Sequence, residues 1–566
     1  FGFGSNVTGI TNSSSTGYQY YAQRYSMTDD FPFAEINVFQ LGLYAQDKWT
    51  VSDKLNLTLG LRIDVPFFMT DLQSNDKVAA ETYRDGIKID VSKYPNAKPQ
   101  FSPRFGFNYK PFDDENGSLQ IRGGTGLFTG TPPYVWISNQ AGNNGVLFGD
   151  LNVRAVKDKN DNIISDGRPS LGFTGNMDTY KPAEGSATRS DIAITDPDFK
   201  YPSLWKSNIA ADYKFGDGWV ATIELLYSKD INAIYHDNIG LYRTEQFVND
   251  GGAGNARPYY NGYYSDREGN QKAANHVVML RNTSKGHSLY TTFQLQKNFV
   301  DGILKGLYLN GSYSFGQSRG VTDGTSSVAT SAWKYRAALD GNAEEVGYTA
   351  GSFDGRLLLS ASYTANWSKY AATSFGLIYQ RYRPFRYSYC YNGDANGDSQ
   401  FSNDLMYIPA NFDEVKDHLL PGDFDSQEDA WKAMNAFIEQ DPYLSKHRGE
   451  YAERNGAVAP FANQLDLSVS HDIKIYQKNG RSHTLRFSFN IANFLNLLNR
   501  NWGVVQTTVL GNQQYQFLTI PKGQGPSAAN NYTLKYTMAK DLDETFKDNL
   551  NDVSRWQMQF GIKYIF

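Results

Sequence analysis

The sequence contains very little cysteine and no long hydrophobic segment. Cys390 is the only cysteine among 566 residues, which excludes a disulfide framework and a cysteine-based zinc or iron–sulfur site. No stretch approaches the roughly 18 apolar residues that a membrane-spanning helix needs, and the mean hydropathy is -0.53. A helical membrane protein is therefore excluded.

Neither acidic nor basic residues are in large excess. The formal net charge is -5, and no basic run with interleaved aromatic residues is present, so we expect no nucleic-acid partner. The first residues, "FGFGSNVTGI", have neither an initiator methionine nor the basic start and apolar run of a signal peptide. We therefore expect the sequence to begin inside a longer protein.

Aromatic residues and glycine are abundant, with 39 Tyr, 35 Phe and 51 Gly. In "KLNLTLGLRID" the apolar residues alternate with polar or small ones from Leu55 to Ile63. The same period of two recurs in "WVATIELLYS", "GLYLNGSYSF", "TLRFSFNIAN" and "RWQMQFGIKYIF". Such patterns predict strands of about ten residues, which is the length that a tilted strand needs to cross a bilayer.

Thirteen strands are predicted in this way. They lie near 35–49, 55–66, 101–111, 118–129, 205–215, 219–230, 286–299, 305–318, 356–368, 370–383, 463–475, 484–496 and 554–566. Turn-like connections such as "VSDK" and "FGDG" alternate with long ones such as 131–203 and 384–462. A soluble sandwich or propeller would have strands of about five or six residues and no such asymmetry. The fold class is therefore all-β: a transmembrane antiparallel β-barrel with short periplasmic turns and long extracellular loops.

An odd number of strands leaves such a barrel incomplete, because both of its ends should lie in the periplasm and an open edge in lipid exposes unpaired backbone groups. We therefore predict that residues 1–34 are mainly an extracellular loop segment and that residues 35–566 are the C-terminal part of the barrel. The upstream strands are expected to be missing from this chain or to lie in another one.

Several segments together resemble the barrel of a TonB-dependent outer-membrane receptor, of the Oar-like branch related to the SusC-type transporters of Bacteroidota. These segments are "NVFQLGLYAQDKWTVSDKLNLTLGLRIDVP", "FSPRFGFNYKPF", "IRGGTGLFTGTPPYVWISNQAGNNG", "LYSKDINAIY", "DANGDSQFSNDLMYIP" and "FSFNIANFLNLLNRNWG". The resemblance implies a 22-stranded barrel that holds an N-terminal plug domain preceded by a TonB box. Neither the plug nor the TonB box is visible in this sequence.

The resemblance implies a protein of the Gram-negative outer membrane that imports a large or scarce nutrient with energy from the TonB complex. The alternative is a passive or structural barrel: a porin, an adhesin or a component of a secretion or surface complex. Expected partners are membrane lipid and lipopolysaccharide, the TonB complex through the missing segments, the barrel-assembly machinery and a surface lipoprotein. The sequence does not identify the cargo.

An enzymatic function is not predicted. Ser318 lies in "GQSRG", a formal Gly-x-Ser-x-Gly, but no helical pattern follows it, and a nucleophile elbow needs a strand-to-helix turn. The seven histidines are dispersed, without a His-Glu-x-x-His motif.

One segment has the spacing of a calcium loop. In "DANGDSQFSND" the side chains of Asp394, Asn396 and Asp398 and the carbonyl of Gln400 occupy alternate positions, and Asp404 stands in for the final acidic ligand. Ser399 replaces the usual glycine, and Leu405 occupies the twelfth position. We predict a site for Ca²⁺ or a similar hard cation that stiffens a long loop; the alternative is a turn held by its own Asp and Asn side chains.

Aromatic residues in two loop segments are candidates for contact with cargo, because aromatic faces stack on sugars and pack on peptides. They are Tyr134, Trp136, Tyr259, Tyr260, Tyr263 and Tyr264. The alternative is that these side chains pack among themselves. In the loop at 384–462, residues 427–440 have helical spacing and predict a helix docked on its neighbours.

The last strand also resembles the C-terminal signal that the barrel-assembly machinery recognises. Its elements would be Gln559, Gly561, Tyr564 and Phe566. By this resemblance, Phe566 is expected to be the true end of the protein.

Overall fold

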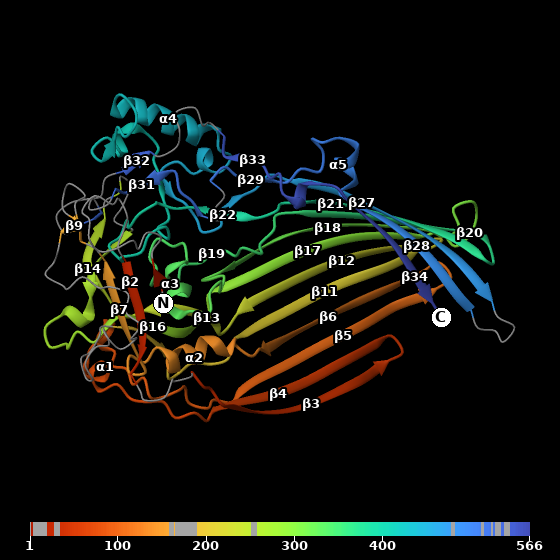
Figure 1. Cartoon of the computed structure of the whole chain (residues 1–566). Helices are drawn as coiled ribbons and strands as arrows, with labels where there is room; N and C mark the ends of the chain where they lie inside the picture. Colours follow the sequence, from red (N-terminus) through yellow and green to blue (C-terminus); the bar gives the residue numbers. More distant parts are fainter. Residues whose placement is uncertain are drawn as a thin grey trace.

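The protein is represented by a computed structural model, which describes residues 2–3, 20–27, 34–154, 156–157, 163–164, 190–248, 250, 257–476, 482–510, 514–521, 525–526, 534–536 and 544–566. Its main element is one curved antiparallel sheet (Figure 1). Each strand on the main path of this sheet is hydrogen-bonded to the strand of the path that comes next along the chain. A folded layer made of the long connections lies at one end of the strands, at the left of Figure 1.

Thirteen strands form the continuous path of this sheet, as the sequence predicts. They are β3 (Val38–Ser52), β4 (Leu55–Phe68), β5 (Gln100–Asp114), β6 (Gly117–Thr129), β11 (Ser203–Phe215), β12 (Trp219–Asp230), β17 (Gly286–Asn298), β18 (Leu307–Gly320), β20 (Arg356–Ser368), β21 (Ala371–Tyr382), β27 (Ala462–Tyr476), β28 (Ser482–Ala492) and β34 (Gln557–Ile565). The short strand β19 (Gly347–Tyr348) pairs with the end of β18.

One face of the sheet exposes large apolar side chains. Leu59, Ile223, Phe293 and Phe560 are 51%, 45%, 47% and 66% exposed although they lie in the middle of paired strands. In the register, Ile223 is opposite Phe293, so the apolar residues of neighbouring strands share this face. An apolar band of this extent is typical of the lipid-facing side of a membrane barrel.

The other face is polar and carries charged pairs. Arg122 on β6 contacts Asp212 on β11 with an Nε–Oδ2 distance of 2.9 Å, and Arg486 on β28 contacts Asp472 on β27 at 2.6 Å. Polar side chains on the face away from lipid are typical of a barrel interior.

The end of the sheet with the short turns carries a row of aromatic rings. Phe112 and Tyr213 are 6.3 Å apart between ring centroids, Tyr213 and Phe215 are 5.2 Å apart, and Phe215 and Trp219 are 6.2 Å apart. Aromatic residues concentrate at the level of the lipid headgroups in membrane barrels. The row therefore marks one edge of the membrane-spanning band.

The long connections form what we call the loop layer, made of the described residues within 69–99, 130–202, 231–285, 321–355, 383–461 and 493–556. Its helices are α1 (Asp76–Ala80), α2 (Tyr134–Gly142), α3 (Ala329–Lys334), α4 (Gln427–Gln440) and α5 (Phe494–Leu498), with 3₁₀ turns at Arg84–Gly86, Tyr264–Asp266, Phe412–Glu414, Leu444–Lys446 and Asp552–Ser554. Among the helices that the structure describes, none is both long enough and apolar enough to cross a membrane.

Short strands complete the loop layer and the region before β3. They are β1 (Gly2–Phe3), β2 (Tyr20–Ser26), β7 (Phe148–Arg154), β8 (Val156–Lys157), β9 (Ile163–Ile164), β10 (Ser190–Thr195), β13 (Ala233–Asn238), β14 (Leu241–Val248), β15 (Arg257–Tyr263), β16 (Ala274–Thr283), β22 (Arg386–Tyr389), β23 (Tyr407–Ile408), β24 (Leu419–Leu420), β25 (Glu450–Tyr451), β26 (Ala457–Val458), β29 (Gln506–Thr508), β30 (Gln514–Tyr515), β31 (Leu518–Thr519), β32 (Leu534–Tyr536) and β33 (Phe546–Asp548).

Among the described residues, the largest buried hydrophobic cluster lies in the loop layer and not within the sheet. Helix α4, which the spacing predicts at 427–440, contributes Met434, Phe437 and Ile438 to it. Ser426 caps this helix by accepting a hydrogen bond from the Asp429 amide, as expected of an N-cap serine. The layer is therefore a folded body with its own core.

The main sheet has two edges. Within the described residues β3 pairs only with β4, and β34 pairs only with β28. Of residues 1–34, which are predicted to form an extracellular loop, most lie outside the described residues; β2 pairs with β7 and β1, not with the main sheet. The division at residue 34 and the missing upstream strands stay predictions.

Candidate functional site

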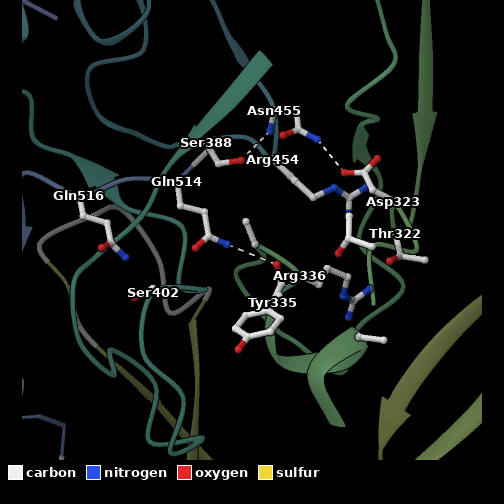
Figure 2. A pocket seen from close by; sticks show the side chains of 13 residues that line it. Thr322, Asp323, Tyr335, Arg336, Ser388, Ser402, Arg454, Asn455, Gln514 and Gln516 are labelled. Atoms are coloured by element: carbon white, nitrogen blue, oxygen red, sulfur yellow. Dashed lines mark hydrogen bonds between the residues drawn. The ribbon is translucent and has the colours of Figure 1, made fainter. Parts of the chain in front are cut away.

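A polar cavity of about 510 Å³ opens within the loop layer. Three long connections contribute to it: 321–355, 383–461 and 493–556. Its walls are made by Thr322, Asp323, Thr325, Ala332, Tyr335, Arg336, Ala337, Ser388, Ser402, Arg454, Asn455, Gln514 and Gln516 (Figure 2). Figure 2 shows Arg454 beside Asp323 on one side and the two glutamines on the other.

Local structure fixes these side chains. Arg336 follows the short helix α3, whose Trp333 is buried and donates from its indole to Asn342. Ser388 lies in β22, which pairs in parallel with β30 so that Ser388 is opposite Gln514. Segments that are far apart in the sequence therefore meet around one space.

Arg336 is buried and is held by backbone carbonyls. Its guanidinium donates to the carbonyl of Val321 at 3.3 Å, to that of Ala343 at 3.0 Å and to that of Gly341. Its Nε–H is buried and has no hydrogen-bond partner among the described residues.

Arg454 is bound in the same manner. It donates to the carbonyls of Val321, Gly320 and Gly347, and its Nε–H is also buried without a partner. Both guanidinium groups therefore converge on the carbonyl oxygen of Val321.

The environment disfavours these two charges. Burial lowers the pKa of Arg336, although the negative charges of Glu345, Asp340 and Asp237 oppose this shift. Burial also lowers the pKa of Arg454 to about 10, although Asp323 and Glu345 oppose the shift; the nearby Arg336 lowers it further. Within the described part of the chain, neither guanidinium has an ion-pair partner within 4.0 Å. The carboxylate of Asp323 instead accepts from the Ala350 amide and the Asn455 side chain, each at 2.9 Å.

The predicted calcium segment is buried beside a different arginine. Arg257 is fully buried between Asp250, at 3.0 Å, and Asp404, at 3.2 Å. Asp404 also accepts from the Ala395 amide at 2.8 Å. Burial raises the pKa of Asp404, and the nearby Asp398 raises it further.

The remaining predicted ligands form turns of the Asx type. Asp394 accepts from the amides of Gly397 and Ser399 at 2.6 and 2.9 Å, Asn396 accepts from the Asp398 amide, and Asp398 accepts from the Gln400 amide. Burial and the charge of Asp394 raise the pKa of Asp398 to about 7. Among the described residues, no group of three or more His, Cys, Asp or Glu side chains is placed to hold a metal ion.

The structure therefore departs from a loop in which three carboxylates share one ion, because Asp404 is turned to Arg257. Asp394 and Asp398 have no ion pair among the described residues, and the neighbouring Asn403 donates to Asp398 while its Oδ1 is buried without a partner. The cation site at Asp394, Asn396, Asp398, Gln400 and Asp404 stays a prediction.

None of the six aromatic candidates for cargo contact lines the cavity. Tyr260 is buried and donates to Asp340 at 2.7 Å, and Tyr259 belongs to the large hydrophobic cluster. Tyr134 and Trp136 are half-buried and contact Tyr201 and His236.

Tyr263 and Tyr264 pack in the same way, edge-on against His276 and Tyr242. The six side chains thus contact other parts of the loop layer, as the alternative interpretation expects. A role in cargo contact stays a prediction.

The cavity residues were not found from the sequence. Arg336 and Arg454 lie in "SAWKYRAALD" and "EYAERNGAVAP", which carry no recognisable motif. Only the packing of separate loops brings them together.

Two further predictions concern strands. Ser318 lies inside β18 and not at a strand-to-helix turn. Of the predicted assembly signal, Gln559, Gly561 and Tyr564 lie on β34, and Phe566 follows it, 91% exposed. Tyr564 stacks on His483 with ring centroids 5.6 Å apart.

Comparison with known proteins gives a family match over most of the chain. The family model described as "Outer membrane beta barrel domain" matches residues 1–527. None of the curated proteins matches the sequence significantly.

Solved structures give weaker likenesses. A mutant of the ferric enterobactin receptor PfeA from Pseudomonas aeruginosa is 10% identical with a TM-score of 0.38, over 97% of this chain and 50% of that one. The siderophore receptor PirA from Acinetobacter baumannii is 8% identical with a TM-score of 0.38, over 85% and 47%. The outer membrane transporter YddB from Escherichia coli is 9% identical with a TM-score of 0.36, over 93% and 54%. The chain spans about half the length of these proteins.

Proposed function

The chain belongs to the outer membrane beta barrel domain family, and from this premise we propose that it is part of an importer that takes up a large or scarce nutrient with energy from the TonB complex. It is an outer-membrane protein built on an antiparallel barrel sheet.

One observation carries this proposal: the connections on one end of the sheet form a folded layer with its own core and a polar cavity of about 510 Å³. A passive pore needs an open path, and a purely structural barrel needs no internal cavity. A preformed concave site with a few convergent polar groups is what ligand recognition requires.

The finer features belong to the same proposal. We assign the protein to the Oar-like branch related to the SusC-type transporters of Bacteroidota, on the segments that resemble that branch. Upstream strands would then complete a 22-stranded barrel, which would hold a plug domain preceded by a TonB box. Lipopolysaccharide, the barrel-assembly machinery and a surface lipoprotein are its proposed partners.

Uptake in living cells tests the proposal. Cells that carry the full-length gene are compared with a deletion strain and with a strain lacking TonB, and the depletion of nutrients from a defined medium is measured by mass spectrometry. We expect at least one solute to be depleted only when both the gene and TonB are present.

The alternative function is a passive or structural barrel, such as a porin, an adhesin or a component of a secretion or surface complex. Gene-dependent uptake that persists without TonB would identify a passive pore. Unchanged depletion of every solute after deletion of the gene would exclude import altogether.

We also propose, independently of import, that the segment beginning at Asp394 binds Ca²⁺ or a similar hard cation. Support comes from the buried Asp398, which has no ion pair among the described residues, and from the buried Asn403 Oδ1, which has no hydrogen-bond partner. Oxygen atoms of carboxylates and amides are the ligands that Ca²⁺ prefers.

A further inference from the structure

We propose that the cavity of the loop layer binds the oxyanion of a small hydrophilic acid, such as a sugar carboxylate, and that acids of this kind are the cargo. The inference rests on the proposed import function and assigns a chemical class to its substrate.

The first step is the pair of buried charges. Arg336 and Arg454 are 5% and 4% exposed, and both donate to the same carbonyl oxygen, that of Val321. Bringing two like charges together away from water is costly unless an opposite charge accompanies them. Carbonyl dipoles satisfy several N–H groups but supply no negative charge.

The contrast with Arg257 is informative. That buried guanidinium has two carboxylate partners, Asp250 and Asp404. The loop layer thus neutralises a buried arginine where it has only a structural role. In the described residues Arg336 and Arg454 have no such partner within 4.0 Å, and they are the two arginines on the cavity wall.

The second step concerns the guanidinium N–H groups that donate no hydrogen bond to the described residues. Each of the two Nε–H groups is buried and has no acceptor in the part of the chain that the structure describes. The planar guanidinium group suits carboxylate and phosphate oxygens because several N–H groups point in fixed directions. An oxyanion in the cavity would place an opposite charge next to both guanidinium groups.

The third step is the chemistry of the remaining wall. Thr322, Ser388, Gln514 and Gln516 line this space with hydroxyl and amide groups (Figure 2). Thr325 also lines it. These groups donate and accept hydrogen bonds, as a polyhydroxylated ligand requires. The volume of about 510 Å³ lies in the range of small-molecule sites.

One carboxylate also lines the cavity. Asp323 lies beside Arg454 (Figure 2), but its oxygens accept from the Ala350 amide and the Asn455 side chain. Among the residues that line the cavity, two guanidinium groups and one carboxylate leave one net positive charge. The nearby carboxylate of Glu345 offsets part of this charge, so a monoanionic ligand is favoured over a dianionic one.

Binding to the purified protein in detergent tests the inference. Calorimetric titrations use D-galacturonate, glucose 6-phosphate and, as the uncharged control, D-galactose. We expect galacturonate to bind and galactose not to bind. Binding of glucose 6-phosphate with equal or higher affinity than galacturonate would replace the carboxylate by a phosphate as the recognised group and overturn the assignment to sugar carboxylates.

Variants locate the site. Arg336 and Arg454 also tie the loops together, so the test uses Thr325→Asp, which adds a negative charge to an exposed position on the cavity wall. The affinity for galacturonate should fall roughly tenfold or more, because like charges a few ångströms apart repel. Ser327→Asp is the matched control, since Ser327 is exposed on the same loop but does not line the cavity.

Three results would overturn the inference: no binding of galacturonate, equal binding of galactose, or the same loss of affinity in both variants. These outcomes leave import itself open, because the binding measurement needs neither TonB nor a cell. Conversely, binding without TonB-dependent uptake would reject TonB-driven import and the assignment of these acids as its cargo, and would retain the binding site.

Discussion

Buried arginines in the loop layer are hydrogen-bonded in two different ways. Arg257 lies between two carboxylates, whereas Arg336 and Arg454 donate to backbone carbonyls. In the first arrangement, carboxylates balance the positive charge of the arginine inside the protein. The second leaves positive potential at a cavity wall, and at the scale of single residues this difference separates a structural arginine from a ligand-binding one.

His236 provides a prediction about pH. Its ring is buried against the edge of Trp136, with ring centroids 5.7 Å apart, and burial, with Arg336 nearby, lowers its pKa to about 4. The unfolded chain, with an ordinary histidine pKa of about 6.5, takes up the proton first on acidification. The contribution of neutral His236 to stability is therefore complete above about pH 6.5 and is lost as the pH falls through about 4.

We expect this loss to reach about 3 kcal/mol. Urea unfolding followed by tryptophan fluorescence at neutral and acidic pH measures it. The His236→Gln variant, which does not titrate, should lose less stability than the wild type on acidification. Equal losses in the two proteins would refute the prediction.

The cation proposal predicts a response to Ca²⁺ that depends on Asp398. After chelation, adding Ca²⁺ at about a hundred times its Kd should stabilise the wild type by about 2.7 kcal/mol, visible as a higher unfolding midpoint. Asp398→Asn should abolish the increase, and Asp417→Asn, which alters an exposed acid of the same loop, should retain it. An equal increase in both variants, or none in the wild type, would end the proposal.

The predictability of the sites follows from how their residues are spaced along the chain. The acidic segment could be singled out because its residues occur within eleven consecutive positions, so that a local turn aligns them. The cavity could not, since Arg336, Ser388, Arg454 and Gln514 meet only after three loops have folded on one another. Asp404 and Arg257, which form an ion pair, are likewise far apart in the sequence.

Helix α4 anchors the loop layer through its buried face. Met434 is fully buried in the hydrophobic cluster, whereas Lys432 on the same helix is exposed. Met434→Ala should lower the free energy of unfolding of the loop layer by about 2–5 kcal/mol, because the substitution leaves a cavity. Urea titration monitored by fluorescence measures the change.

The control for this prediction is Lys432→Ala. A substitution at an exposed helical position should change stability by less than about 0.5 kcal/mol. If the two variants were equally stable, the helix would not be anchored through its apolar face.

Among the elements, the strands of the main sheet and α4 were predictable for the same reason. In each element the apolar residues recur at a regular spacing. The spacing is two residues in strands that have one face in lipid, and 3.6 residues in a helix that packs one face against a hydrophobic core. The short strands of the loop layer were not predictable. β22 and β30, for example, pair over two residues each, and so short a ladder leaves no period in the sequence.

The orientation of the whole molecule can be tested with its single cysteine as background. Cys390 is fully buried, and burial raises the pKa of its thiol, which makes it unreactive. A cysteine introduced by Asp417→Cys in the loop layer should react with a membrane-impermeant maleimide on intact cells. Asp301→Cys, in the turn between β17 and β18, should react only after the outer membrane is permeabilised.

The wild type should stay unlabelled under both conditions. Labelling of the turn position on intact cells, with the loop position protected, would invert the orientation and place the cavity on the wrong side for capture of nutrients.

At this largest scale the sequence predicted the barrel sheet but not the loop layer as a body. Alternation and connection lengths are local properties, and they predict thirteen strands. The buried core of the layer joins residues from 248 to 520, and no local pattern records which distant loops share it.

The presence of a core outside the sheet has a consequence for how the molecule responds to heat. The strands are stabilised by their backbone ladder and by lipid or detergent, whereas the loop layer depends on burial of apolar side chains away from water. These contributions weaken under different conditions, so unfolding need not be a single cooperative event. The loop layer can therefore unfold and refold while the sheet remains intact, so a mutation can destabilise the loop layer without destabilising the barrel sheet.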